Sequence, residues 1–157
     1  MIILGWIQVV LGLLAIASGA IVLRGVLKVA LGGNRVVWFL RFSLIAAVAG
    51  LLPLPRYFST IQGICMLSVY CSGAVVLAWR KFHLIGIWRP VFAFFIVALL
   101  YLNVVFVSIR LFALSPLFAI ASTESGSIFD VAQLCLASVF AMLGVLAARM
   151  CHHRQTH

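Results

Sequence analysis

Long apolar stretches without charged residues dominate this sequence. No charged side chain occurs between Ile2 and Leu23, and none occurs between Val91 and Ile109. Only 8% of the 157 residues are charged, whereas soluble domains carry about a quarter. A helix crosses the roughly 30 Å hydrocarbon layer with about 20 apolar residues. A chain this short cannot bury several such stretches in one water-soluble core, so we predict that its solvent is lipid.

Five such stretches are predicted to cross the bilayer as helices. The expected fold is therefore an all-α integral membrane bundle that forms one domain, residues 1–157. Prolines follow the second stretch, and Pro90 is favourable at the first position of the fourth helix, where its amide would be unpaired anyway. Glycines between Arg24 and Arg35 predict a turn there. The predicted spans are 2–23, 36–52, 61–79, 90–112 and 128–148, and residues 149–157 are a polar cytoplasmic tail.

Basic side chains are predicted to gather on one side of the membrane. With five spans, nine of the 11 Lys and Arg residues share a side with the C-terminus, whereas Glu124 and Asp130 lie on the other side. Cationic loops usually stay in the cytoplasm, so we expect the N-terminus outside and the C-terminus inside. Because these charges are scattered in short turns, the net charge of +9 does not indicate a nucleic-acid partner. The nine are Arg24, Lys28, Arg35, Arg41, Arg80, Lys81, Arg89, Arg149 and Arg154, and the other two are Arg56 and Arg110.

Small residues recur at helical spacing and predict seams of close helix packing. Gly5, Gly12 and Gly19 are seven residues apart, which is nearly two turns, so they form one stripe along the first span. Helices in lipid associate largely through such small residues, because no hydrophobic drive brings them together there. The last span carries a similar edge at Ala137, Ala141, Gly144 and Ala148.

Six polar side chains in the outer half of the predicted bundle are candidates for a ligand site. Polar groups within a span are functional candidates by default, and these could converge on an outward-facing pocket centred on Asn103 and Arg110. The alternative is structural, since Gln62 and Asp130 fit capping boxes, Arg110 can reach the headgroups, and amides can bond across helices. The six are Gln8, Gln62, Asn103, Arg110, Asp130 and Gln133.

The turn between the third and fourth spans is basic and rich in tryptophan. Lys and Arg near the cytoplasmic surface attract anionic lipids, so this turn is a candidate headgroup site. The alternative is a topology signal combined with an interfacial aromatic belt. The candidate residues are Arg80, Lys81, His83, Trp88 and Arg89.

The sequence carries no motif for catalysis or cofactor binding. Neither Gly-x-Ser-x-Gly, His-Glu-x-x-His nor a phosphate loop occurs, and the four cysteines include no Cys-x-x-Cys pair. No histidine lies within a predicted span, which disfavours a haem held between helices, and the lack of a deep Asp or Glu disfavours a proton-coupled pump. From these observations we expect no enzyme and no cofactor. We also expect no metal site, because the spacing of the tail residues Cys151, His152, His153 and His157 is not that of a standard zinc site.

Several short segments along nearly the whole chain carry a resemblance to known sequences. They are Gly5-Trp6-Ile7-Gln8, Leu11-Gly12-Leu13, Phe82-His83-Leu84 with Gly86, Trp88 and Arg89, Leu100-Tyr101-Leu102-Asn103-Val104, and Ala121-Ser122-Thr123-Glu124-Ser125 leading to Phe129 and Gln133-Leu134. Together these segments resemble a family of small bacterial multi-span membrane proteins of unknown function. The resemblance implies five spans in the bacterial inner or plasma membrane and transfers no activity. Arg41 and the Pro-Leu-Pro end of the second span depart from the family pattern.

Two functions are compatible with these features. The first is a non-enzymatic accessory or lipid-associated membrane subunit, whose partners would be the bilayer, anionic lipids, a second copy of the chain or another membrane protein. The second is a protein that binds or transports a small polar molecule through the outward-facing pocket near Asn103 and Arg110. One structural observation distinguishes these two functions: whether side chains from several spans line an enclosed polar cavity.

Overall fold

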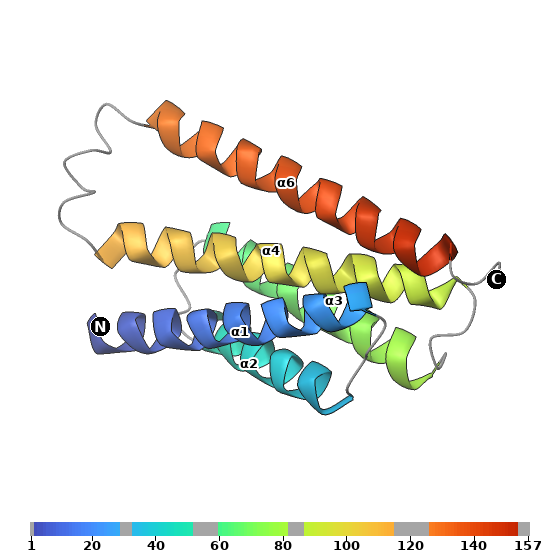
Figure 1. The fold of residues 1–157 in the computed structure, drawn as a ribbon. Helices are drawn as coiled ribbons and strands as arrows, with labels where there is room; N and C mark the ends of the chain where they lie inside the picture. The colour runs from blue at the N-terminus through green and yellow to red at the C-terminus, as the bar shows by residue number, and fades with distance from the viewer. Residues whose placement is uncertain (1, 29–32, 52–59, 82–86, 115–125, 154–157) are drawn as a thin grey trace.

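Five helices form the fold in a computed structural model that describes residues 2–28, 33–51, 60–81, 87–114 and 126–153. The chain runs up and down along the bundle, and its two ends lie at opposite ends of it (Figure 1). The prediction of an all-α fold is confirmed. The helices are α1 (Ile2–Lys28), α2 (Gly33–Leu51), α3 (Thr60–Arg80), α4 (Trp88–Leu114) and α6 (Gly126–His153).

Four of these helices are long and apolar enough to cross a membrane, which suggests a membrane protein. Their qualifying segments are Gly5–Gly25, Gly33–Leu51, Ile61–Arg80 and Trp88–Leu111. The apolar segment described in α6, Gln133–Ala147, is shorter. At 1.5 Å per residue it spans about 22 Å, less than the roughly 30 Å hydrocarbon layer. The fifth crossing and the orientation of the termini therefore stay predictions.

The helices extend beyond the ranges expected from the sequence, most clearly in α1, α2 and α6. The turn predicted from Arg24 begins too early, because α1 continues through a buried Gly25 to Lys28, and α2 already starts at Gly33. A single glycine costs a helix only about 1 kcal/mol relative to alanine, so it does not end one by itself. At the other end of the chain, α6 continues to His153, so the first part of the predicted tail is helical.

The central helix of the bundle is α4. It packs against α1, α3 and α6, while α2 packs against α1 and α3. Phe92, Ile96 and Leu99 of α4 are fully buried, and they join Phe39 of α2 and Val75 of α3 in the main hydrophobic cluster. Helix α6 lies along the side of α4 away from α2 (Figure 1), so α4 separates α6 from most of the bundle.

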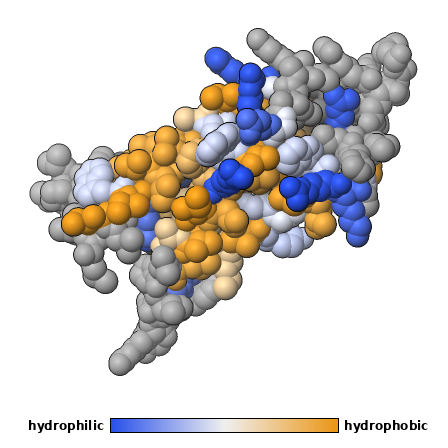
Figure 2. Space-filling view, turned by 90° about the horizontal axis from the view of Figure 1, so that it is seen from below, coloured by the Kyte–Doolittle hydropathy of each residue, from blue (hydrophilic) through white to orange (hydrophobic). Residues whose placement is uncertain are grey.

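Large apolar side chains cover much of the outer surface. Hydrophobic surface runs across the middle of the face seen in Figure 2, and hydrophilic residues gather mainly toward one end. Exposed apolar residues occur on every helix, among them Trp6 on α1, Ile45 on α2, Met66 on α3, Phe94 on α4 and Met142 on α6. Such a surface is unfavourable in water and normal against lipid tails.

Candidate functional site

Asn103 lies deep in the bundle and connects α4 to α2. It is 4% exposed, and its Nδ2 donates hydrogen bonds to Oγ of Ser43, 3.0 Å away, and to the carbonyl of Leu99, 2.8 Å away. The Ser43 hydroxyl is itself buried, 1% exposed. An amide without a partner in such a place would cost several kcal/mol, so the Ser43 bond lets α4 keep this polar residue within its span.

Gln8 makes a second polar connection to the same helix. It is 1% exposed on α1, and its Nε2 donates to the carbonyl of Ala49 over 2.6 Å. Because α2 ends at Leu51, Ala49 is among the last four residues, whose carbonyls have no partner within the helix. Gln8 therefore satisfies an acceptor that α2 leaves open.

Glycines set the close approach of the helices around these two bonds. A Cβ placed on Gly12 would overlap Cγ2 of Val107, and one placed on Gly19 would lie 2.7 Å from Phe39 and from Leu100. Real Cβ atoms essentially never come this close to a neighbour, so a larger residue at either position would require α1 or the neighbouring side chains to move. Gly5, the first glycine of the stripe, is buried near the start of α1.

Arg110 lies two turns beyond Asn103 on α4. Its guanidinium carbon is 5.7 Å from the centre of the Phe106 ring, a distance compatible with a cation–π contact. Its Nε is buried and has no hydrogen-bond partner among the described residues. Phe106 also packs close to Gly50 of α2. A Cβ added to that glycine would lie 3.0 Å from the Phe106 ring and 2.5 Å from the sulfur of Cys65 on α3. The arginine thus lies beside the packed junction of α2, α3 and α4.

The structure brings together only part of the six-residue polar cluster. Gln8 and Asn103 both reach α2, whereas Gln62 is buried near the start of α3. Gln133 is half-buried on α6, which packs mainly against α4. The side chain of Asp130 lies outside the described residues. The polar pocket stays a prediction, and in the described structure Gln8 and Asn103 serve helix packing.

The basic turn lies at the end of the bundle where α3 ends and α4 begins. Arg80 and Lys81 are exposed, and Trp88 and Arg89 are half-buried. His83 lies outside the described residues. The up-and-down course of the chain brings the end of α6, with its exposed Arg149, to this same end of the bundle (Figure 1). Cationic side chains from three helices therefore share one end.

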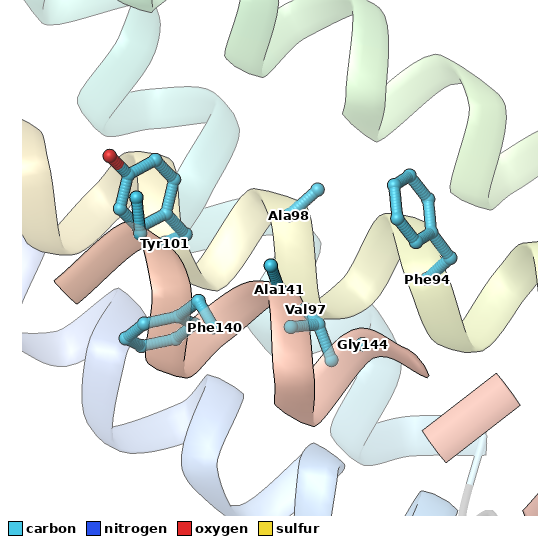
Figure 3. A pocket seen from close by; sticks show the side chains of 8 residues that line it. Phe94, Val97, Ala98, Tyr101, Phe140, Ala141 and Gly144 are labelled. Carbon is cyan, nitrogen blue, oxygen red and sulfur yellow. The ribbon is translucent and has the colours of Figure 1, made fainter. Parts of the chain in front are cut away.

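A narrow apolar groove runs between α4 and α6. Its volume is about 180 Å³, and Figure 3 shows small side chains at its middle with aromatic rings at both ends. At one end the rings of Tyr101 and Phe140 lie 5.6 Å apart, tilted by 50°. Near the other end, a Cβ on Gly144 would be only 3.6 Å from Phe94, in ordinary contact. The lining residues are Phe94, Val97, Ala98, Tyr101, Ala137, Phe140, Ala141 and Gly144.

Sequence reasoning identified one wall of this groove and missed the other. The small residues of the last span predicted a packing edge, and three of them, Ala137, Ala141 and Gly144, line the groove. The wall on α4 includes Phe94 and Tyr101, which were not selected as candidates. Aromatic residues at seven-residue spacing on one helix, facing small residues on another, were the available signal.

The described part of the chain offers an apolar site without metal ligands. It contains no group of three or more His, Cys, Asp or Glu side chains that could hold a metal ion. The described cysteines are free thiols, with Cys65 and Cys71 buried and Cys135 exposed. A hydrocarbon chain is the kind of ligand that the lining of the groove can accommodate. Comparison with known proteins adds no further assignment, since no protein-family model, curated protein or solved structure matches this chain.

Proposed function

We propose that this chain is a five-span integral membrane protein that acts as a non-enzymatic, lipid-associated accessory subunit. The observation that carries the proposal is the use of its deepest polar side chains. Gln8 and Asn103 donate hydrogen bonds to α2, and these bonds support a role for both side chains in holding the helices together. Interhelical hydrogen bonds of this kind stabilise a membrane bundle by about 0.6 kcal/mol on average.

The outer surface supports an association within the membrane. On α6, Leu134 and Met142 are each 67% exposed, and only Gly144 and Ala147 are buried among its described side chains. Exposing one such large apolar side chain to water costs about 1.5–3 kcal/mol relative to burying it. Lipid tails or the apolar face of another membrane protein remove that cost.

The positions of the basic residues support an N-terminus outside the cell. Apart from Arg110, seven basic residues have described side chains, and the up-and-down chain places them in the half of the bundle that holds the end of α1. Of these residues, Arg41 lies furthest from that end of the bundle. Its guanidinium is 5.4 Å from the ring centre of Trp38, and Trp38 lies about one helical turn nearer to that end. The stem of Arg41 thus runs toward the headgroups, as snorkelling requires. The seven are Arg24, Arg35, Arg41, Arg80, Lys81, Arg89 and Arg149.

Single-cysteine labelling tests the five-span topology. In a background without the native cysteines, Lys81→Cys and Arg149→Cys are expected to react with an impermeant maleimide only when the cytoplasmic face is open. Gly126→Cys, at the start of α6, is expected to react only from outside. If Arg149→Cys and Gly126→Cys react from the same side, α6 does not cross and the five-span topology is wrong.

Photocrosslinking tests the accessory role. A benzophenone amino acid replaces Met142 on α6 or, as a matched position, Met66 on α3, which is 57% exposed. In native membranes, the accessory role predicts a discrete crosslink to one other protein chain from at least one of these faces. Lipid adducts alone at both positions, with the protein folded and inserted, would rule out a stable partner and with it the accessory role.

A second function, binding of a small polar molecule, is favoured by one observation. The buried Nε of Arg110 has no hydrogen-bond partner among the described residues, and a bound carboxylate or phosphate would supply one. This function predicts a saturable rise in melting temperature of the detergent-solubilised protein with small carboxylates or inorganic phosphate. Arg110→Met should abolish the rise, and Arg41→Met, an exposed arginine on α2, is the matched control. An equal rise in both variants would exclude Arg110 as the ligand site.

A further inference from the structure

We propose that the groove between α4 and α6 holds one acyl chain of an anionic phospholipid, whose phosphate binds Arg89 and Arg149. The inference deepens the proposed lipid association and rests on the membrane topology given above. Two observations carry it independently of each other. The first is the shape and lining of the groove, and the second is the charge at one end of it.

The packing of α6 on α4 places the two arginines at the same end of the groove. Phe94 lies opposite Gly144, and Tyr101 lies opposite Phe140, so the two helices are antiparallel in a defined register. Arg89 comes five residues before Phe94, and Arg149 comes five residues after Gly144. Each therefore lies about 7.5 Å beyond the same end of the groove, measured along its own helix axis.

No acidic side chain lies at this end of the bundle among the described residues. Glu124 and Asp130 are the only acids in the sequence. Position 130 lies in the first turns of α6, at the opposite end of that helix from Arg149, and Glu124 lies outside the described residues. Arg149 is exposed and Arg89 is half-buried, so both guanidinium groups can be reached from the membrane surface. An anionic headgroup supplies the missing negative charge, and guanidinium groups bind phosphate oxygens in a fixed, two-pronged geometry.

The size of the groove selects part of a lipid chain as its occupant. About 180 Å³ is too small for a drug-sized ligand, which needs about 300–1,000 Å³. A partner helix, about 10 Å across, is also too wide. At about 30 Å³ for each water-sized group, the space accommodates roughly six methylene groups of a chain that continues into the bilayer. Ala98, Ala141 and Gly144 leave this space between the flanking aromatic rings (Figure 3).

Lipid exchange measured by native mass spectrometry tests the proposal. The protein is released from nanodiscs that contain equal amounts of phosphatidylglycerol and phosphatidylcholine with identical chains. We expect the wild type to retain one phosphatidylglycerol in preference to phosphatidylcholine. Arg89→Gln combined with Arg149→Gln should lower that preference about 30-fold, since each basic residue near the surface contributes about a fivefold gain. Arg24→Gln, at the same end on α1, is the matched control and should retain the preference.

A second pair of variants tests the groove itself. Ala141→Leu fills the groove from α6 and should lower retention of both lipids, whereas Ala17→Leu makes the same change on the exposed face of α1. Equal retention of the two lipids by the wild type, or equal losses in the arginine double variant and Arg24→Gln, would overturn the proposal. Retention of soluble glycerol phosphate, which lacks acyl chains, to the same extent as phosphatidylglycerol would overturn it as well. These failures leave the topology intact, whereas labelling of Arg149→Cys only from outside would refute the topology on which the proposal rests.

Discussion

Gly12 offers the sharpest test of the helix packing. Replacing it with alanine adds one methyl group, which would overlap Cγ2 of Val107 on α4. Valine has essentially one side-chain rotamer in a helix, so Val107 cannot turn away and α1 must move outward. Overpacking of this kind costs about 1–3 kcal/mol, and the better helix propensity of alanine returns about 1 kcal/mol. We expect Gly12→Ala to change stability by a net loss of about 0–2 kcal/mol.

Because that net effect is small, coupling to Val107 is the decisive quantity. Val107→Ala alone removes the overlapping methyl group and leaves a gap, at a cost of about 1–2 kcal/mol. The added methyl of Gly12→Ala occupies that gap in the double variant. The double variant should therefore be more stable than the sum of the two single changes predicts, by at least about 1 kcal/mol.

Unfolding in mixed micelles, followed by tryptophan fluorescence, gives the four stabilities of this cycle. Gly73→Ala on α3 is the matched control, because a Cβ at Gly73 would meet nothing within 4 Å. That control should be neutral or stabilised by up to about 1 kcal/mol. The packing argument fails if Gly12→Ala behaves like Gly73→Ala or if the coupling energy is zero.

Three further outcomes follow from the described contacts. Asn103→Leu and Ser43→Ala should each lower stability by about 0.6–1.7 kcal/mol. In the same unfolding assay, the double variant should lose less stability than the sum of the two single variants. Additive losses would mean that the hydrogen bond between the two side chains contributes nothing. Gly144→Ala should be neutral or stabilising by up to about 1 kcal/mol, because its Cβ meets Phe94 at an ordinary 3.6 Å; a large loss would disprove the register of α6. In the detergent-solubilised protein at alkaline pH, where exposed thiols ionise, Cys135 should react with a maleimide faster than the buried Cys71. Mass spectrometry measures both rates, and equal rates would contradict the burial of Cys71.

The fold class was predictable because the long uncharged apolar stretches that determine it can be recognised directly in the sequence. The uncharged lengths around Leu11 and Leu99 exceed what a small soluble core can hold, and only helices satisfy their own backbone in lipid. Helix ends were less predictable, since glycine marks a turn only when other forces agree. Gly25 lies inside α1 because nothing else in that stretch opposes the helix.

The contacts between helices were not predictable from the sequence in the same way. An amide at position 103 requires a partner, but Ser43 becomes that partner only through the relative rotation of α2 and α4. The groove depends on which residue of α6 lies opposite Tyr101. Small-residue patterns such as the one around Gly144 mark a face, and they leave its register undefined.

The bond from Gln8 to Ala49 has a consequence for how the chain tolerates change. In a continuing helix the carbonyl of residue 49 would accept from the amide of residue 53, and that residue is proline, which has no amide hydrogen. Gln8 therefore bonds to a carbonyl whose usual helical donor, four residues further along the chain, is missing. Since the acceptor belongs to the main chain, the residue at position 49 can change as long as its side chain fits, whereas loss of the glutamine would remove the hydrogen bond that this carbonyl accepts.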